Sequence, residues 1–126
     1  MKRSSITSVA LGLALALCAM AAVPGCGKNS NPTSPPVTAD ITIEIVGNSG
    51  ATSFSPNPRA VTVGQTVSWH NALGTTHTAT ADGGGFDTGN IAGGATSAPI
   101  TMTTAGTFGY HCGIHPSMVG TLTVNP

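Results

Sequence analysis

Apolar and polar residues alternate over short stretches of the chain from Asp40 onward, and Gly or Pro separates these stretches. The apolar positions that repeat with a period of two are Ile41, Ile43 and Ile45; Val61 and Val63; Val67 and Trp69; Ala79 and Ala81; Ile100 and Met102; Phe108 and Tyr110; and Leu122 and Val124. This period is typical of half-buried β-strands, because it places alternate side chains on one face. Seven or so stretches within 87 residues predict an all-β fold, a Greek-key β-sandwich of about seven to eight short strands.

The composition of this segment also favours strands over helices. Sixteen threonines lie between Asp40 and Pro126, and a branched Cβ restricts χ1 in a helix. Two glycine runs, 83–85 and 93–94, indicate loops, since neither precedes the helix and the lysine of a phosphate-binding loop. Asp82 and Asp87 flank the first run, where carboxylate side chains commonly close turns. We expect residues 40–126 to form one folded domain.

The N-terminus has the features of an export signal. Lys2 and Arg3 precede a 15-residue apolar run from Val9 to Val23, and small residues follow it. A positive start, a short apolar stretch and small residues describe a secretory signal peptide. The run is shorter than the ~20 residues that a membrane-spanning helix needs. We therefore expect residues 1–25 to be removed on export.

Two cleavage sites are compatible with this signal. Val23-Pro24-Gly25-Cys26 resembles a bacterial lipobox, in which Cys26 becomes the acylated N-terminus, although Pro24 stands where Ala or Ser is usual. The segment 19–21 instead offers an A-x-A site for ordinary secretion. The polar segment directly after Cys26 favours the lipobox, because it would serve as a tether.

The segment 26–39 is that predicted tether. It is rich in Ser, Thr, Asn and Pro and shows no apolar periodicity, which indicates a flexible linker. A lipid on Cys26 would hold the domain at a membrane surface without spanning the membrane. We expect an exported protein, periplasmic or at the cell surface, that is lipid-anchored to a bacterial membrane.

The charge of the chain excludes several classes of protein. Only four Lys or Arg occur and the formal net charge is zero, so a nucleic-acid-binding surface of clustered cations is excluded. Charged residues make up 6% and hydrophobic residues 40%, which is unlike a charged disordered chain. After export the net charge would be −2, which is too small to steer a partner strongly.

Cys112 is the single cysteine of the predicted domain. Cys18 would leave with the signal and Cys26 would form the mature N-terminus, so no partner for an internal disulfide remains. An isolated thiol in an oxidising compartment requires another explanation. Metal ligation is the explanation that the neighbouring residues support.

Cys112, His115 and Met118 are spaced three residues apart in a Gly- and Pro-containing loop between two predicted strands. One thiolate, imidazoles and a thioether are soft donors, and His₂Cys with a weak axial Met is the blue-copper arrangement. Zinc would not be expected to take Met as its fourth ligand. Calcium would need a dense shell of oxygens, and the chain has only four Asp or Glu. The chain also lacks the C-x-x-C-H motif of haem attachment.

Strand parity separates the histidines. Cys112 shares the inward parity of Tyr110, and His77 shares that of the two alanines at 79 and 81. His70 and His111 have the opposite parity and are expected to point outward. His77 is therefore the candidate that joins the loop residues in one site.

Residues 54–124 resemble a cupredoxin of the plastocyanin/azurin family. FSPNPRAVTVGQTVSWHN is similar to the early strands of that family, and HTATADGGGFDTG to the stretch around its first His ligand. The C-x-x-H-x-x-M loop is similar to the short form seen in amicyanins. The resemblance implies one type 1 copper ion, with His77, Cys112 and His115 as the trigonal ligands and Met118 as the axial ligand.

This sequence departs from the family pattern beside the first ligand. Thr78 stands where the family often has an Asn that pins the copper loop, and Thr76 stands where Pro is common. A hydroxyl at position 78 could replace the amide in that hydrogen bond.

The resemblance implies a monomeric electron carrier that shuttles one electron through a Cu(II)/Cu(I) couple between redox partners outside the cytoplasm. By analogy the partner would be a cytochrome or another copper protein. The exposed edge of His115 would be the docking point, ringed by small or apolar residues such as Leu73, Gly74 and Pro116, and His111 would offer a second route.

Other readings of the same residues remain open. A surface copper chaperone or scavenger would use similar ligands but release its metal readily. A β-sandwich interaction module without metal would not need all four ligands. An enzyme is disfavoured, because Cys112 and His115 lack an oxyanion site or a third group that would complete a nucleophilic dyad.

Overall fold

The computed structural model of the protein describes residues 38–126. The predicted signal peptide, Cys26 and all but the last two residues of the predicted tether lie outside this range. The described elements are β1 (Ile41–Ile45), β2 (Phe54–Ser55), β3 (Arg59–Thr62), β4 (Thr66–Asn71), β5 (Thr80–Ala81), β6 (Ile100–Thr101), β7 (Gly106–His111) and β8 (Val119–Asn125). None of the elements in this range is a helix that could cross a membrane.

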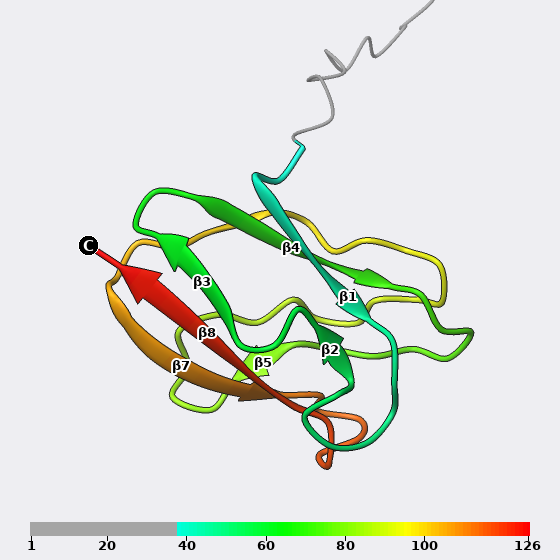
Figure 1. Ribbon diagram of the computed structural model, residues 1–126. Helices are drawn as coiled ribbons and strands as arrows, with labels where there is room; N and C mark the ends of the chain where they lie inside the picture. Colours follow the sequence, from blue (N-terminus) through cyan, green and yellow to red (C-terminus); the bar gives the residue numbers. More distant parts are fainter. Residues whose placement is uncertain (1–37) are drawn as a thin grey trace, which may run out of the picture. The chain divides into compact units, whose positions relative to one another are not determined.

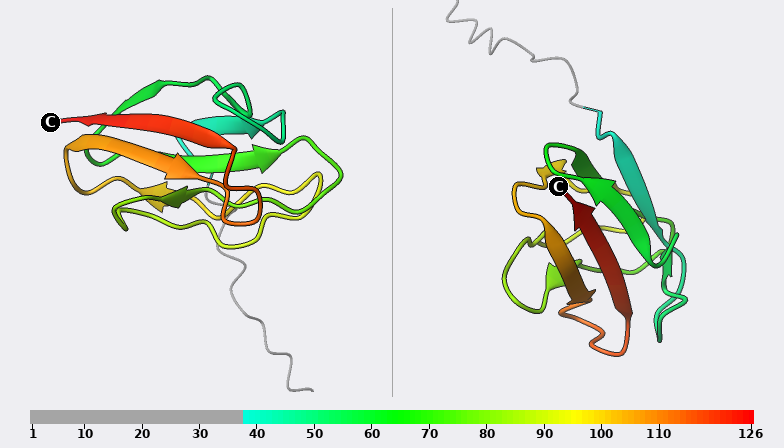
Figure 2. Two further views of the ribbon diagram at one scale, coloured as in Figure 1. Left: turned by 90° about the horizontal axis from the view of Figure 1, so that it is seen from below. Right: turned by 60° about the vertical axis from the view of Figure 1, so that its left-hand side comes forward.

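The eight strands form two four-stranded sheets that pack face to face (Figures 1 and 2). One sheet has the order β2-β1-β4-β6, and the other has the order β3-β8-β7-β5. The chain passes repeatedly from one sheet to the other, so each sheet contains one parallel pair, β1 with β4 and β3 with β8. The predicted all-β sandwich is confirmed.

The parallel pair β1–β4 defines the two ends of the sandwich. Ile41 lies opposite Val67, and Ile45 lies opposite Asn71. Asp40 is thus at the end where β4 begins, where its carboxylate accepts hydrogen bonds from the backbone N–H and hydroxyl of Thr66 at 2.7 and 2.8 Å. These bonds hold the pKa of Asp40 below its ordinary value. The loops that follow Asn71 lie at the opposite end.

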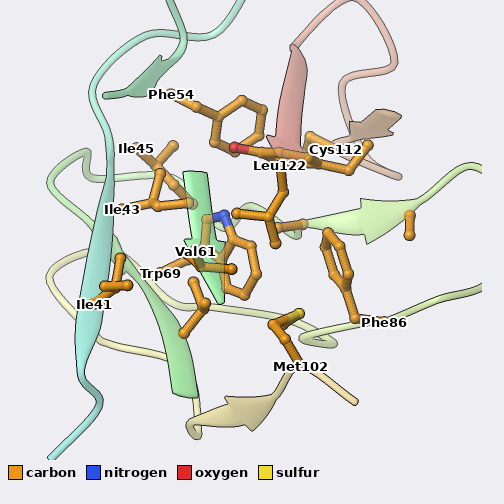
Figure 3. Close-up of a cluster of buried hydrophobic side chains, with 14 of the residues drawn as sticks. Ile41, Ile43, Ile45, Phe54, Val61, Trp69, Phe86, Met102, Cys112 and Leu122 are labelled. Atoms are coloured by element: carbon orange, nitrogen blue, oxygen red, sulfur yellow. The ribbon is translucent and has the colours of Figure 1, made fainter. Parts of the chain in front are cut away.

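The core forms between the sheets, where the period-two positions face one another. The side chain of Trp69 is fully buried at its centre, between the isoleucines of β1 and Leu122 of β8 (Figure 3). Its ring stacks on Phe86 with centroids 5.1 Å apart and meets Tyr110 edge-on at 5.9 Å. Three predicted inward positions differ, because Val63 is exposed beyond the end of β3, and Ile100 and Phe108 are only partly buried.

The predicted strand through His77 is shorter than the sequence pattern indicates. Only Thr80 and Ala81 pair as β5, while His77 makes an isolated bridge with Ile91. The ladder is interrupted because the backbone N–H of Thr78 donates to Cys112 Sγ instead of a neighbouring strand. This irregular segment is what brings the two parts of the candidate site together.

Candidate metal centre

Two loops at one end of the sandwich supply the candidate ligands. The loop between β7 and β8 carries Cys112, His115 and Met118, and the segment after β4 carries His77. The Cys112 N–H donates to the Met118 carbonyl at 3.1 Å, and the Met118 N–H donates to the His115 carbonyl at 2.9 Å. These bonds close the first loop tightly, so its side chains are held close to one another.

Three donor atoms from these loops form a small triangle. Cys112 Sγ lies 3.7 Å from His77 Nδ1 and 3.9 Å from His115 Nδ1, and the two nitrogens lie 3.2 Å apart. All three atoms lie within 4.8 Å of one another. The point equidistant from them is about 2 Å from each atom, which is close to the length of a bond from a transition metal to imidazole nitrogen or thiolate. One metal ion fits this space.

The triangle is shielded from water on the side of the core. His77 and Cys112 are fully buried, and His115 is partly buried. Burial, together with the neighbouring His115, lowers the pKa of His77 from its ordinary value. A lowered pKa keeps His77 neutral at neutral pH, which is the state in which an imidazole binds a metal.

The ring of His77 is oriented by hydrogen bonds on its far side. Its Nε2 lies 3.0 Å from the hydroxyl of Thr75. When Nε2 carries the proton it donates to this hydroxyl, and the Nδ1 lone pair is then free to face Cys112. The backbone of His77 is fixed as well, because it exchanges two hydrogen bonds with Ile91, at 3.1 and 2.8 Å.

A buried amide holds the loop that leads to His77. The Nδ2 group of Asn71 donates to the carbonyls of Thr75 and Ile91 at 2.7 and 2.9 Å, and its Oδ1 accepts from the Leu73 N–H at 3.1 Å. Asn71 was not among the site residues predicted from the sequence. Asn71 shares the inward parity of Val67 and Trp69, and a polar residue at a core position of a strand was a usable signal.

Thr78 connects the two loops. Its backbone N–H donates to Cys112 Sγ at 3.3 Å, and its hydroxyl accepts a hydrogen bond from the Gly113 N–H at 2.7 Å. The hydroxyl of Thr78 therefore makes the loop contact in which it was expected to replace the amide of an Asn. Thr76 is exposed.

Met118 occupies the C-terminal end of the loop with its side chain fully buried. A segment between β1 and β2 fixes the backbone on either side of it. The Gly50 N–H donates to the Ser117 carbonyl at 2.7 Å, and the Val119 N–H donates to the Gly50 carbonyl at 3.3 Å. No sequence signal indicated this contact, because residues 46–53 show neither periodicity nor metal-binding side chains.

The two histidines outside the triangle point outward, as strand parity predicts. His111 Nδ1 lies 2.6 Å from Asp82 Oδ1, and His70 Nε2 lies 4.0 Å from Glu44 Oε2. The side chain of Asp82 thus reaches across to β7, and the prediction that it closes its own turn is wrong. Asp87 does close its turn, because its Oδ1 accepts from the Gly89 N–H at 2.8 Å.

The donor set has a definite chemical preference. A thiolate with two imidazole nitrogens, and a buried methionine on the same loop, is a soft set that suits copper better than zinc or calcium. The arrangement of His77, Cys112, His115 and Met118 is consistent with a type 1 copper site.

Comparison with known proteins gives a family and close structural relatives. The sequence profile of the family described as copper binding proteins, plastocyanin/azurin family, matches residues 41–125. A plastocyanin from Scenedesmus fuscus is 33% identical over 102 residues, which cover 68% of this chain and 99% of that protein.

Solved structures agree with this match. A purple cupredoxin from Nitrosopumilus maritimus superimposes with a TM-score of 0.60 at 30% identity, covering 68% of this chain and all of that one. A Cu(I) variant of amicyanin superimposes with a TM-score of 0.58 at 27% identity, covering 71% of this chain and 87% of that one. A copper-containing nitrite reductase from Thermus scotoductus matches at 29% identity and a TM-score of 0.58, over 73% of this chain but only 25% of the enzyme.

Proposed function

Since this chain belongs to the plastocyanin/azurin family of copper-binding proteins, we propose that it is a blue copper protein that carries single electrons between redox partners outside the cytoplasm. The observation that supports this most directly is the triangle of Cys112 Sγ, His77 Nδ1 and His115 Nδ1, whose centre has room for one metal ion.

We assign His77, Cys112 and His115 as the three principal copper ligands and Met118 as the axial ligand. His77 and Cys112 are fully buried, and they come from two different loops. Met118 is fully buried on the same loop as Cys112, and a thioether is the weak axial donor that such sites use.

Bound copper supplies a Cu(II)/Cu(I) couple that takes up and releases one electron. The chain holds its donor atoms in one geometry, so that little rearrangement accompanies the change of charge. Asn71 and Thr75 fix the ring of His77, and Thr78 fixes the sulfur of Cys112. The Thr78 N–H donates to the thiolate and stabilises its negative charge.

We propose that a redox partner docks over His115. This residue is partly buried and is flanked by Ile114, whose exposed fraction is 47%, and by exposed Pro116. Leu73 is partly buried and Gly74 is exposed on the other loop. A small apolar contact suits a short-lived encounter that must dissociate after electron transfer.

The proposed location follows from the N-terminus. We propose that the protein is exported, that Cys26 becomes its acylated N-terminus, and that segment 26–39 tethers the domain to a membrane surface. A periplasmic or cell-surface position would bring a soluble cytochrome or another copper protein within reach.

A copper chaperone or scavenger is the second candidate function, because it would use the same soft donors. The rate at which copper leaves the protein separates the two. An electron carrier retains its ion over many redox cycles, whereas a chaperone transfers it to a competing ligand. The nitrite reductase relative does not favour an enzyme here, because this chain spans only a quarter of its length.

The test is the visible absorption spectrum after addition of Cu(II), with Cys112→Ser as the matched control. An intense charge-transfer band in the native protein, absent from the variant, is the expected result, because the band requires a copper–thiolate bond. A colourless native protein would overturn the assignment. Repeated reduction and reoxidation in the presence of a copper chelator would then distinguish a carrier from a chaperone.

A further inference from the structure

A chain of hydroxyl groups runs from the candidate copper loop to the surface. The Gly113 N–H donates to Thr78 Oγ1 at 2.7 Å, and Thr78 Oγ1 lies 3.3 Å from Thr80 Oγ1. The Thr80 hydroxyl donates in turn to Asp87 Oδ1 at 3.2 Å. This series of contacts, which we call the threonine relay, links the residue after Cys112 to a carboxylate on the neighbouring loop.

The two ends of the threonine relay fix the direction of every bond in it. A backbone N–H can only donate, and an ionised carboxylate can only accept. Thr78 must therefore use a lone pair for Gly113 and direct its proton to Thr80, and Thr80 must direct its proton to Asp87. A hydroxyl rotates freely about its C–O bond, so it presents a definite lone pair only when its proton has a fixed partner.

The backbone around the threonine relay keeps its members in place. Thr80 and Asp87 form an isolated antiparallel bridge. The Thr88 N–H donates to the Ala79 carbonyl at 3.1 Å, and the Ala79 N–H donates to the Thr88 hydroxyl at 2.9 Å. Thr78 itself is 7% exposed, so water has little access to compete for its hydroxyl.

Thr78 therefore holds the loop by two groups. Its N–H contacts Cys112 Sγ, and its hydroxyl contacts the residue that follows Cys112. We propose that Asp87 is a positioning residue for the copper loop, which acts through Thr80 and Thr78 to keep the Gly113 amide, and with it the Cys112 sulfur, in place. This inference rests on the proposed function only for its effect on copper.

The variants separate this role from the turn that Asp87 also closes. Thr80→Val removes the middle hydroxyl at nearly constant volume and leaves the Asp87–Gly89 bond intact. Thr80→Ser restores the hydroxyl and serves as the conservative variant. Thr42→Val is the matched control, because it removes a hydroxyl of β1 that contacts Ser68 Oγ and is not part of the threonine relay.

The first readout is the amide hydrogen exchange of Gly113 in the metal-free full chain, measured by NMR relative to an amide of β8. We expect Thr80→Val and Asp87→Ala to speed this exchange about fivefold, as the loss of one hydrogen bond would. Thr80→Ser and Thr42→Val should leave the exchange rate of Gly113 within about twofold of the native value. If Thr80→Val is unchanged, whether or not Thr78→Val speeds the exchange, Asp87 has no part in positioning the loop and the inference is wrong.

The second readout is the charge-transfer band of the copper-loaded protein. Thr80→Val should shift the band, and Thr80→Ser should return it to the native position. Failure of the proposed function would show as a missing band in every variant, while the exchange data on the metal-free chain would still decide the role of Asp87. If Gly113 exchanges faster but the band does not shift, Asp87 positions the Gly113 amide only, and the proposed effect on the Cys112 sulfur is wrong.

Discussion

The hydroxyl of Tyr110 is buried in the core and has no hydrogen-bond partner among residues 38–126. Its ring packs edge-on against Phe54, Phe86 and Trp69, with centroid distances of 4.7, 5.6 and 5.9 Å. Burial raises the pKa of Tyr110 to about 12. The neutral side chain suits the apolar core, whereas a buried phenolate without a hydrogen-bond partner would destabilise the folded state.

This shift makes the stability of the protein sensitive to alkaline pH. Below pH 10 Tyr110 is protonated in both states; above it the unfolded chain loses the proton while the folded domain keeps it until about pH 12. The free energy of unfolding should therefore fall by up to about 2–3 kcal/mol between pH 10 and 12.

Urea unfolding of the metal-free protein at several pH values in this window measures the effect. Tyr110→Phe should flatten the decline, because it removes the titrating group and also an unpartnered hydroxyl. Tyr110 is the only tyrosine of the chain, so phenolate absorbance reports on it alone. Equal slopes in the native protein and the variant would contradict the prediction.

Leu73 tests the proposed docking surface. A carboxylate at this position would place like charges against each other when two copies of the protein exchange an electron, and such a juxtaposition costs several kcal/mol. Leu73→Glu should slow electron self-exchange at least about tenfold while the copper absorption band stays unchanged. Val63→Glu is the matched control, since Val63 is exposed at the far end of β3, next to Gly64 and Asn125. Equal slowing by both variants would point to net charge as the cause.

At the scale of single residues, much of the candidate site could be predicted from the sequence. Parity and spacing selected His77, Cys112 and His115, whose donor atoms the fold brings together. The same reasoning excluded His70 and His111, which point outward. The supporting contacts were less accessible, because Gly50 and Thr75 act through a backbone group and a short side chain whose partners depend on loop conformation.

At the scale of the elements, the two loops beside His77 pack backbone against backbone. A Cβ built at Gly93 would lie 2.7 Å from the carbonyl oxygens of Gly74 and Leu73. The Gly94 N–H donates to the Asn71 carbonyl at 2.8 Å, which fixes the same approach. A glycine is required at position 93 because the obstruction is backbone, which cannot rotate away.

Gly93→Ala should therefore destabilise the protein by about 1–3 kcal/mol, the range typical of overpacking. It should also weaken copper binding, since Leu73 and Gly74 belong to the loop that leads to His77. Gly83→Ala is the control, because a Cβ there meets nothing within 4 Å. Urea unfolding of the metal-free variants measures the difference, and equal midpoints would show that the loops separate without cost.

The strands were predictable where apolar and polar residues alternate regularly. They were not predictable where a backbone N–H donates to a side chain instead of a neighbouring strand. The inward positions of β1, β4 and β8 follow the pattern, as Ile43, Trp69 and Leu122 show. In the stretch from His77 to Thr80, His77 and Ala79 are buried as the pattern predicts, but Thr78 between them is buried too, and its N–H donates to a sulfur atom instead of a neighbouring strand. A period of two reports which face a side chain occupies and carries no information about its backbone partner.

At the scale of the whole molecule, copper should be coupled to folding. A ligand that binds only the folded state stabilises it, by about 4 kcal/mol at a concentration a thousandfold above its Kd. Removal of copper should therefore lower the unfolding temperature by more than about 10 °C in a domain of this size. Differential scanning calorimetry with and without copper measures this shift. Cys112→Ser should lose most of it, and a full shift in that variant would place the ion elsewhere.

The proposed anchor is also a property of the whole chain. Detergent phase separation of the expressed protein should place the native form in the detergent phase and Cys26→Ala in the aqueous phase, because a lipid on Cys26 is the proposed membrane contact. Mass spectrometry of the mature N-terminus gives an independent reading. A native protein that begins directly after Ala21 and partitions into water would show cleavage at the alternative site.

The parallel pairing of β1 with β4 has a consequence for how such a protein would search for partners. Asp40 and the donor triangle lie at opposite ends of the sandwich. The proposed tether from Cys26 to Asp40 could extend roughly 45–50 Å, so the domain would stay within that distance of its membrane. Attachment through the Asp40 end would leave the copper end free to meet a partner, and confinement to a membrane would raise the effective concentration of any partner held on the same surface. The frequency of collisions with a partner would then depend on the length of the tether. A shorter tether would limit which partners the copper end can reach.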